Sequence, residues 1–248
     1  MAANGQHGSR GIEVVTNEML HEVNKNYFGH ESFRGEQANI CKAVLSGADV
    51  FVQMATGGGK SACFQVPAFL QRGLTIVVSP LQALIMDQVR ELVHGKGLCC
   101  MPYYGDLGTE FLRVCREMVT EGVVRMMYVT PEAIMNDVAL QSVLTAHRVA
   151  RIVVDEAHCI VAWGYDFRPE YARLGELRSM FPGVGVTALT GTATPSTRKS
   201  IKSMLGMQNE TICIKSCYRR NLEISVEIKE DANKNKKHAS GVYAGVAT

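Results

Sequence analysis

Short apolar runs alternate with longer stretches in which apolar residues recur at helical spacing along most of this chain. The runs predict strands at residues 50–54, 74–79, 98–103, 124–130, 151–155, 186–190 and 211–214. The stretches between them predict helices at residues 60–70, 81–94, 109–120, 136–146, 171–181 and 196–205. Strands that alternate with helices in this way form a parallel sheet with helices on both faces, so the pattern predicts an α/β fold.

The two ends of the chain depart from this alternation. Residues 1–15 are mostly polar and are expected to be disordered, and residues 18–28 predict a short amphipathic helix in front of the sheet. Residues 229–241 read KEDANKNKKHASG, a polar and charged composition that is typical of a linker. The folded part is therefore expected at residues 16–228.

Three of the predicted strands are followed by the same short motif. The segments IVVSPL, MYVTPE and TGTATPST each place a serine or threonine before a proline, just ahead of a predicted helix. Serine and threonine are preferred N-caps, and proline fits the first helical position. If the helices begin there, their free amides point from one edge of the sheet, which suits phosphate binding. Each motif alone is also consistent with an ordinary turn between a strand and a helix.

Composition narrows the class of protein without identifying it. Of the 248 residues, 46% are hydrophobic and 20% are charged, as in ordinary folded proteins. The formal net charge of +2 is too small to indicate nucleic-acid binding, so any such interpretation must rest on specific residues. The N-terminal segment lacks the apolar stretch of a signal peptide, and no run reaches membrane-spanning length. We therefore expect an intracellular protein without a membrane partner.

The eight cysteines are scattered, and no two of them form a CxxC pair. This distribution favours reduced, mostly buried thiols over a disulfide framework. Cys213 and Cys217 have a spacing that half of a metal site could use, but no second pair lies downstream. We therefore expect no zinc site within this chain.

The stretch MATGGGKSACF, from Met54 to Phe64, follows a predicted strand and opens a predicted helix. In this context a glycine-rich loop binds nucleotide phosphates, because glycines let the backbone approach them closely. Lys60 would reach the β- and γ-phosphates of ATP, and Ser61 would bind Mg²⁺. Met54 stands where the usual pattern has a glycine that eases the turn, so a flexible turn is the alternative interpretation. The residues assigned to the nucleotide are Thr56, Gly57, Gly58, Gly59, Lys60 and Ser61.

A second motif, RIVVDEAH at residues 151–158, ends an apolar strand in two adjacent acids. Two carboxylates at the end of a buried strand are unfavourable unless a cation meets them. Asp155 is therefore assigned to Mg²⁺, and Glu156 to the water that attacks the γ-phosphate. A cap of the following helix would explain one acid but not both. Together with Lys60, these residues predict a catalytic site that hydrolyses ATP.

Longer segments carry a family resemblance. MATGGGKSACFQVPA, VVSPLQALIMDQV, DEAHCIVAWGYDFRPEYARLGELR and ALTGTATPSTR resemble, in sequence order, motifs of the RecQ-type DNA helicases of superfamily two. FGHESFRGEQ in front resembles that family's adenine-recognition motif, and SCYRRNLEISV resembles the segment that closes its first lobe. The resemblance implies a RecA-like P-loop NTPase lobe at residues 16–228. Residues 229–248 would then be a linker and the start of a second lobe that lies outside this chain.

The same resemblance assigns roles around the nucleotide. Gln37 would bind the edge of adenine, with Arg34 and the ring of His30 against its face, although His30 is equally consistent with a surface histidine. His158 and the segment TGTAT would connect the ATP site to the DNA site. Gly191 stands in that segment where the family usually has alanine, which leaves the coupling geometry open.

DNA is assigned to the same edge of the sheet. The loop WGYDFR, at residues 163–168, contains aromatic rings and an arginine that suit stacking on unpaired bases, at about 1–3 kcal/mol for each base. Trp163 and Phe167 could instead fill a hydrophobic core. The residues assigned to DNA binding or coupling are Ser79, Pro80, Gln82, Thr130, Pro131, Glu132, His158, Trp163, Tyr165, Phe167, Arg168, Thr190, Thr192 and Thr194.

The resemblance implies a helicase that couples hydrolysis of ATP with Mg²⁺ to 3'–5' strand separation of single-stranded or partly duplex DNA. It also implies a role in DNA repair and recombination, in the nucleus of a eukaryote. Since the family's arginine finger comes from the second lobe, this chain is expected to bind ATP, hydrolyse it weakly and not unwind DNA.

Two alternatives stay open: a DExH-box RNA helicase lobe, and a nucleic-acid-binding module that binds nucleotide without catalysis. The loop at residues 163–168 and GGGKS favour the DNA helicase. Retention of both Lys60 and Glu156 weighs against the module.

Overall fold

The computed structural model describes residues 15–163, 168–216, 224–228 and 242–246. The predicted disorder at residues 1–15 and the predicted linker at residues 229–241 lie almost wholly outside the described residues. The chain divides into two compact units, Met1–Lys215 and Ser216–Thr248. In the second unit, β8 (Ile224–Ile228) pairs with β9 (Val242–Val246) in antiparallel register. All the described residues of the candidate chemistry belong to the first unit.

The first unit is built around a parallel sheet of seven strands in the order β3-β4-β2-β5-β6-β1-β7. The strands are β1 (Val50–Gln53), β2 (Leu74–Val78), β3 (Cys100–Tyr103), β4 (Met126–Val129), β5 (Val149–Val154), β6 (Val186–Thr190) and β7 (Thr211–Ile214). Each strand predicted from an apolar run is present, because strands covered on both faces need apolar residues on both. The predicted parallel α/β fold is confirmed.

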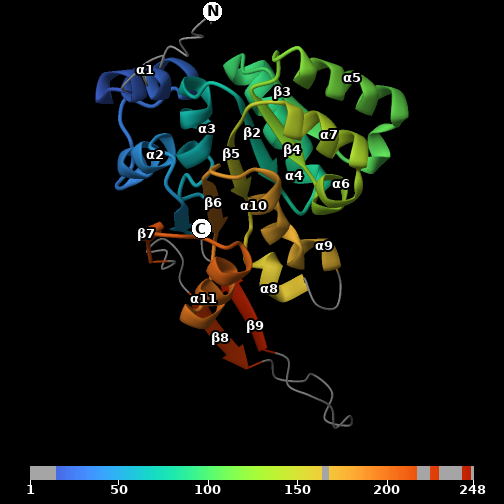
Figure 1. Ribbon diagram of the computed structural model, residues 1–248. Coiled ribbons are helices and arrows are strands. Elements are labelled where there is room, and N and C mark those ends of the chain that lie inside the picture. Colours follow the sequence, from blue (N-terminus) through green and yellow to red (C-terminus); the bar gives the residue numbers. More distant parts are fainter. Residues whose placement is uncertain (1–14, 164–167, 217–223, 229–241, 247–248) are drawn as a thin grey trace, which may run out of the picture. The chain divides into compact units, whose positions relative to one another are not determined.

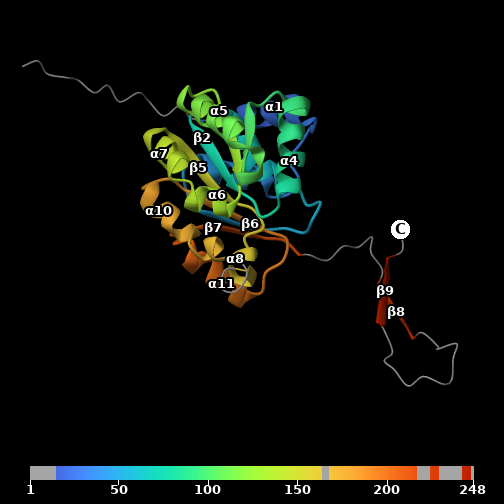
Figure 2. The same cartoon turned by 90° about the vertical axis from the view of Figure 1, so that its right-hand side faces the viewer.

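Helices cover both faces of this sheet (Figures 1 and 2). One face packs against α2 (Gln37–Leu45), α3 (Ala62–Leu70) and α4 (Gln82–Arg90), and α1 (Asn17–Phe28) packs on α3. The other face packs against α5 (Thr109–Thr120), α6 (Pro131–Asn136), α7 (Val138–Ala146), α10 (Leu177–Met180) and α11 (Pro195–Met204). Strand β2 shows how the side chains alternate between the two faces. Ile76 and Val78 pack on the face covered by α5, α6 and α7, and Val77 packs on the face covered by α2, α3 and α4.

Shorter elements complete the unit. They are α8 (Cys159–Trp163), α9 (Pro169–Ala172), the π-helical turn η1 (Glu91–Gly95) and the 3₁₀ turns η2 (Gly105–Leu107) and η3 (Leu174–Glu176). No helix in the described part of the chain has the length and apolar composition that crossing a bilayer requires. The described cysteines, which are all but Cys217, are free, and burial raises the pKa of the Cys63 thiol to about 12.

Two of the three predicted N-caps are confirmed. Thr130 accepts a hydrogen bond from the amide of Ala133 at the start of α6, and Thr194 accepts one from Thr197 at the start of α11. The third was wrong: α4 begins at Gln82, with Leu81 rather than Ser79 at the N-cap position. The Ser79 amide instead donates to the Val129 carbonyl at 3.0 Å, which extends the ladder between β2 and β4.

Other helix boundaries also differ from the predicted ones. The helix expected at residues 136–146 is split, because Asp137 has extended backbone and caps a new helix, α7, by accepting from the Leu140 amide. The helix expected at residues 171–181 is divided into α9, η3 and α10. Helix α2 was not predicted. It begins with Gln37, which therefore lies at a helix N-terminus that faces the nucleotide loop.

The amino edge of the sheet contains a cluster of buried charges. Arg151, near the start of β5, is fully buried and donates to the backbone carbonyls of Val44 and of Ala48, the latter at 2.8 Å. Asp49 accepts from two backbone amides, at 2.8 and 2.7 Å, and from Arg178. Burial lowers the pKa of Arg151 to about 10, against the opposing effect of the Asp49 charge. These groups fix the entry of β1 and β5 into the sheet.

Candidate functional site

The glycine-rich loop leaves β1 at the carboxyl edge of the sheet. Met54 is fully buried in the core, and its amide donates to the Thr190 carbonyl of β6 at 3.1 Å. Met54 is not among the described residues with positive φ, so its position does not require glycine. Gly57 and Gly59 have φ of 78° and 82°, where glycine is needed. The loop therefore has its glycines where its geometry demands them, despite the methionine at its start.

Two further contacts shape this loop. A Cβ at Gly58 would lie 2.8 Å from the Ala55 carbonyl oxygen, so only glycine fits there without a shift. Lys60 donates from Nζ to the Met54 carbonyl at 3.2 Å, which folds the lysine back over the loop. Ser61 precedes α3, and Thr56 is exposed at the tip of the loop. The lysine and the loop amides thus converge on one small region.

Gln37 joins the predicted adenine motif to the loop. Its side-chain oxygen accepts from the Arg34 amide at 2.7 Å, and its amide nitrogen donates to the Gly59 carbonyl at 3.0 Å. A primary amide has two donors and two acceptor lone pairs, so one of each remains for a ligand. Arg34 and His30 are exposed, and the His30 carbonyl accepts from the buried Asn24 side chain at 3.0 Å. The structure therefore connects Gln37 and the Arg34 backbone to the nucleotide loop, whereas the described contact of His30 is with Asn24.

The acids of the DEAH segment follow β5 at the same edge. Burial, and then the neighbouring Glu156 charge, raise the pKa of Asp155 to about 6. Its Oδ1 accepts from the Glu156 amide at 3.0 Å, and the Lys60 charge acts on it in the opposite direction. Glu156 has a positive φ of 46°, a strained conformation for a residue with a side chain. Burial and like charge at Asp155 together mark a site where a cation would be stabilising.

A chain of polar contacts runs from Glu156 to the segment after β6. The Glu156 carboxylate lies 3.2 Å from His158 Nδ1, and the same nitrogen lies 3.0 Å from the Thr190 hydroxyl. The Thr190 hydroxyl donates to the Thr192 carbonyl at 3.1 Å, so its oxygen is free to accept from His158. The Cys159 sulfur, 3.7 Å from Nε2, and then Glu156 raise the pKa of His158 to about 10. The His158 contact lowers the pKa of Glu156 in turn, so the two groups form an ion pair.

The residues present suit Mg²⁺ only if the phosphates of a nucleotide supply further ligands. Among the described residues, no group of three or more His, Cys, Asp or Glu side chains could hold a metal ion by itself. Mg²⁺ keeps several waters and is usually held by one or two protein oxygens together with phosphates. Asp155 and Ser61 supply such oxygens, and burial, followed by the Glu156 charge, raises the pKa of Asp155, so a nearby cation would favour its ionised form. The donor set therefore fits Mg²⁺ that arrives with a nucleotide.

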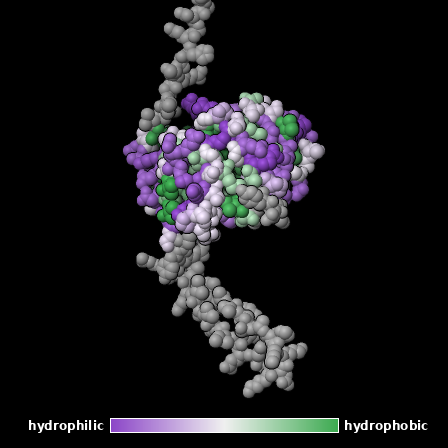
Figure 3. Space-filling view, turned by 60° about the horizontal axis from the view of Figure 1, so that its bottom comes forward, coloured by the Kyte–Doolittle hydropathy of each residue, from purple (hydrophilic) through white to green (hydrophobic). Residues whose placement is uncertain are grey.

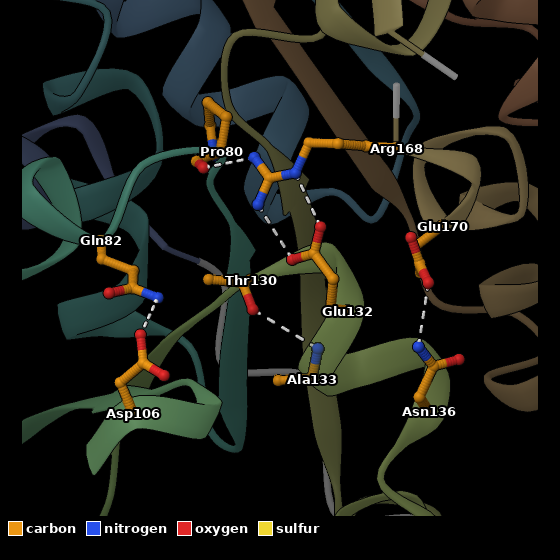
Figure 4. A network of polar contacts seen from close by, with 9 residues as sticks. All are labelled: Pro80, Gln82, Asp106, Thr130, Glu132, Ala133, Asn136, Arg168 and Glu170. Atoms are coloured by element: carbon orange, nitrogen blue, oxygen red, sulfur yellow. Dashed lines mark hydrogen bonds and ion pairs between the residues drawn. The ribbon is translucent and has the colours of Figure 1, made fainter. Parts of the chain in front are cut away.

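Several residues predicted to bind nucleic acid follow β2 and β4, and Figure 4 shows Pro80, Gln82, Thr130 and Glu132 among them, together with Arg168. Arg168 donates to both carboxylate oxygens of Glu132, at 2.7 and 3.0 Å, and to the Pro80 carbonyl at 2.7 Å. Gln82 donates to Asp106 in η2 at 2.9 Å. Pro131 is buried at the first position of α6. The segments that follow β2, β3 and β4 are thus linked to one another by side chains.

A hollow of about 510 Å³ lies between α8 and α11. Its lining residues include His158, Thr192, Thr194 and Thr197, together with the small apolar side chains of α8. Figure 3 views the molecule from the side of α8, α9 and α11, where polar patches and smaller apolar patches alternate over the described surface. The coupling residues of the predicted site therefore border a surface hollow.

Some predicted residues cannot be placed, and some partners were not predicted. Tyr165 and Phe167 lie outside the described residues, and Trp163 is described only as the end of α8. Asp106 and Cys159 were missed as partners. Asp106 follows a predicted strand closely, which is the signal that could have identified it, whereas nothing in the sequence marks the contact of Cys159 with His158.

Comparison with known proteins gives consistent matches. A family model described as "DEAD/DEAH box helicase" matches residues 34–202. The chain is 41% identical over 212 residues to "ATP-dependent DNA helicase Q-like 4B" of Arabidopsis thaliana, a match that covers 84% of the chain and 18% of that protein. It is 39% identical over 217 residues to "ATP-dependent DNA helicase RecQ" of Haemophilus influenzae, covering 88% of the chain and 35% of that protein. The chain thus spans a minor part of each relative.

Solved structures agree on the fold. "Crystal Structure of DUF1998 helicase MrfA bound to DNA" matches with a TM-score of 0.64 at 16% identity, over 80% of this chain and 29% of that chain. At this identity the likeness bears on the fold alone, and it confirms the predicted RecA-like architecture.

Proposed function

Because the chain belongs to the DEAD/DEAH box helicase family and its relatives are RecQ-type DNA helicases, we propose that it is the ATP-binding lobe of a RecQ-like DNA helicase. The observation that carries this proposal is the meeting of three motifs at one edge of the sheet. Gln37 bonds to the glycine-rich loop, and Lys60 folds over that loop. The Lys60 charge opposes the rise in the pKa of Asp155 and contributes to the lowered pKa of Glu156.

In this proposal each residue has one task. The amides of residues 57–61 and Lys60 bind the phosphates, and Gln37 uses its remaining donor and acceptor on the adenine edge. Asp155 and Ser61 would hold Mg²⁺, which neutralises phosphate charge when bound. Glu156 is ionised at neutral pH, since its pKa lies below the ordinary value for glutamate, and it orients and deprotonates the attacking water.

The contact chain through His158 supports communication with nucleic acid. Glu156 cannot change position without affecting His158, which also contacts Thr190 in the segment that leads to Thr194. We assign single-stranded or partly duplex DNA to this edge through Ser79, Gln82 and Thr130. The aromatic loop at residues 163–168, of which residues 164–167 lie outside the described part of the chain, stays a predicted DNA contact. Polarity of movement, a role in repair and recombination, and an intracellular location (nuclear in a eukaryote) follow from the family resemblance.

Hydrolysis by these 248 residues should be weak. The family resemblance places an arginine finger on a second lobe in cis, and such a group contributes about 10³–10⁵ in rate in related NTPases. The proposed behaviour of this chain is therefore binding of Mg-ATP with feeble turnover and no strand separation.

Calorimetry with a non-hydrolysable ATP analogue and Mg²⁺ tests the nucleotide site, and ATPase and strand-separation assays test turnover. We expect saturable binding, slow hydrolysis and no unwinding. Lack of binding at millimolar nucleotide would refute the proposal, and rapid DNA-stimulated hydrolysis would refute the need for a second lobe. Single-stranded DNA and RNA of equal length, compared by fluorescence anisotropy, separate the DNA helicase from its RNA alternative.

A further inference from the structure

We infer that Arg168 is a positioning residue rather than a nucleic-acid contact. Its guanidinium, paired with Glu132 and bonded to Pro80, holds the segments that follow β2 and β4 at a fixed spacing. The inference deepens the proposed function and rests on it, because those segments are the ones assigned to nucleic acid.

The edge of the guanidinium group is already engaged (Figure 4). Arginine has five N–H donors, and three of those of Arg168 are bonded at 2.7 to 3.0 Å. Two of these bonds form a bidentate pair with Glu132, the geometry in which arginine also binds phosphate. A phosphate at this fork would therefore have to displace a carboxylate that already neutralises the Arg168 charge, and only two donors lie outside these bonds.

One flat face of the guanidinium group is also in contact. Its central carbon lies 5.7 Å from the centre of the Tyr171 ring, and Tyr171 is only 1% exposed. A nucleic-acid base could stack only on the opposite face of Arg168. The Glu132 fork and one face of the guanidinium, which are the two parts that usually contact nucleic acid, are thus held by groups of this chain.

The segment after β2 needs such support because it has no helix cap. Helix α4 begins only at Gln82, and its N-cap residue makes no side-chain hydrogen bond. The Pro80 carbonyl is held by Arg168, and Gln82 is held by Asp106. The segment after β4 is different, since Thr130 caps α6. Fixing these segments before nucleic acid binds reduces the ordering entropy that binding would otherwise cost.

A neighbouring contact offers a matched control. Arg168 directly precedes α9, and Glu132 belongs to α6. Asn136 of α6 donates to Glu170 of α9 at 3.0 Å, so this bond also joins α6 to α9 (Figure 4). This bond does not reach the segment after β2. Glu170→Ala therefore removes an acid and a bond between α6 and α9 but leaves the Arg168 contacts in place.

The test measures the affinity of the whole 248-residue chain for a labelled single-stranded DNA oligonucleotide at several salt concentrations. The variants are Glu132→Ala, Arg168→Ala, Arg168→Lys, the Glu132→Ala/Arg168→Ala double variant and Glu170→Ala. We expect each single change at Glu132 or Arg168 to weaken binding about tenfold, the size expected for loss of charged hydrogen bonds. The double variant should be no weaker than either, and Glu170→Ala should change binding less than twofold.

The signs of these effects separate positioning from direct contact. Loss of the acid Glu132 should strengthen DNA binding if Arg168 contacts phosphate, and weaken it if the pair holds the segments. Arg168→Lys keeps the charge but not the fork, so near-normal affinity would overturn the inference. So would a salt slope reduced by about one in Arg168→Ala, since that marks a lost phosphate contact.

The outcome for the unaltered chain keeps the two proposals apart. If the unaltered chain fails to bind DNA at low salt, the proposed function fails and this inference fails with it. If the unaltered chain binds but the Glu132 and Arg168 variants behave independently, only this inference fails. Far-ultraviolet circular dichroism checks that each variant is folded. If Arg168→Ala does not fold, the DNA affinity of Arg168→Lys tests the inference instead.

Discussion

The two edges of the central sheet hold their charges in different ways. At the amino edge, Asp49 accepts three hydrogen bonds, and Arg151 is bonded to backbone carbonyls while fully buried. At the carboxyl edge, Lys60 contacts only a loop carbonyl among its described hydrogen bonds, and Asp155 sits beside a like charge. Strand β5 joins the two edges, since it begins near Arg151 and ends just before Asp155.

This difference separates charges that stabilise the fold from charges that await a ligand. A buried ion is tolerated when partners from the same chain satisfy it, as they do for Asp49 at the amino edge. The raised pKa of Asp155 and the strained backbone of Glu156 are costs that a bound ligand could relieve. By the same criterion, Arg168 and Glu132 resemble the amino edge although they lie at the carboxyl edge.

The largest effect is expected from breaking the amino edge. Asp49→Ala removes the acceptor of two amides and leaves Arg178 and Arg151 without their compensating charge, so unfolding free energy should fall by about 3–5 kcal/mol. Urea denaturation measures this loss. Glu110→Ala is the matched control, because its exposed pair with Arg113 should contribute nothing measurable. A loss at Asp49 as small as that of the control would contradict the comparison.

The next largest effect is expected in ligand binding at the carboxyl edge. Lys60→Ala should weaken ATP binding at least a hundredfold, or by about 3 kcal/mol, because the lysine would contact two phosphates. Stability should change little, since the lysine bonds only to its own loop among the described contacts. Calorimetry compares it with Lys42→Ala on the exposed side of α2. Equal affinity in the two variants would remove Lys60 from the site.

A smaller effect concerns the ion pair of Glu156 and His158. The Cys159 contact and then Glu156 raise the folded-state pKa of His158 to about 10, above its ordinary value. Protonated His158 therefore stabilises the fold fully below about pH 6.5, and this effect is lost as pH rises through 10. Glu156→Gln should lower the His158 pKa towards its ordinary value, as followed by NMR of the imidazole ring. It should also keep ATP binding and, in a chain with the second lobe, abolish hydrolysis. An unchanged His158 midpoint would assign the shift to Cys159 alone.

The smallest effect is expected at Gly191. A Cβ there would lie 3.8 Å from Lys60 Nζ and 3.9 Å from the Thr56 hydroxyl, which are ordinary contacts. Gly191→Ala should therefore change ATP affinity less than twofold. Gly59→Ala is the sharp contrast, because a Cβ there would lie 2.2 Å from Gln37 Nε2 in a backbone with φ of 82°. Similar behaviour of the two variants would show that the loop geometry differs from the one described.

The local sequence pattern was sufficient to predict strands and helix caps whose determining interactions are local or repeat along the chain. Burial on both faces forces strands to be apolar throughout, so β1 to β7 could be located from apolar runs. The caps at Thr130 and Thr194 were predictable because the capped amide lies three residues away. The same rule was wrong at Ser79, because the amide of this residue pairs with β4 and the helix begins only at Gln82.

The sequence by itself determined the fold class, the glycine-rich loop and the adjacent acids. The fold class follows from the alternation of apolar runs with helical periodicity, and the loop and the acids each consist of residues that are neighbours in the sequence. Only the tertiary structure decided which charges are satisfied. Arg168 meets Glu132 across 36 residues and Pro80 across 88, and Arg151 reaches Ala48 across 103. Such pairs leave no periodic or local trace, because they depend on which loops the sheet order brings together.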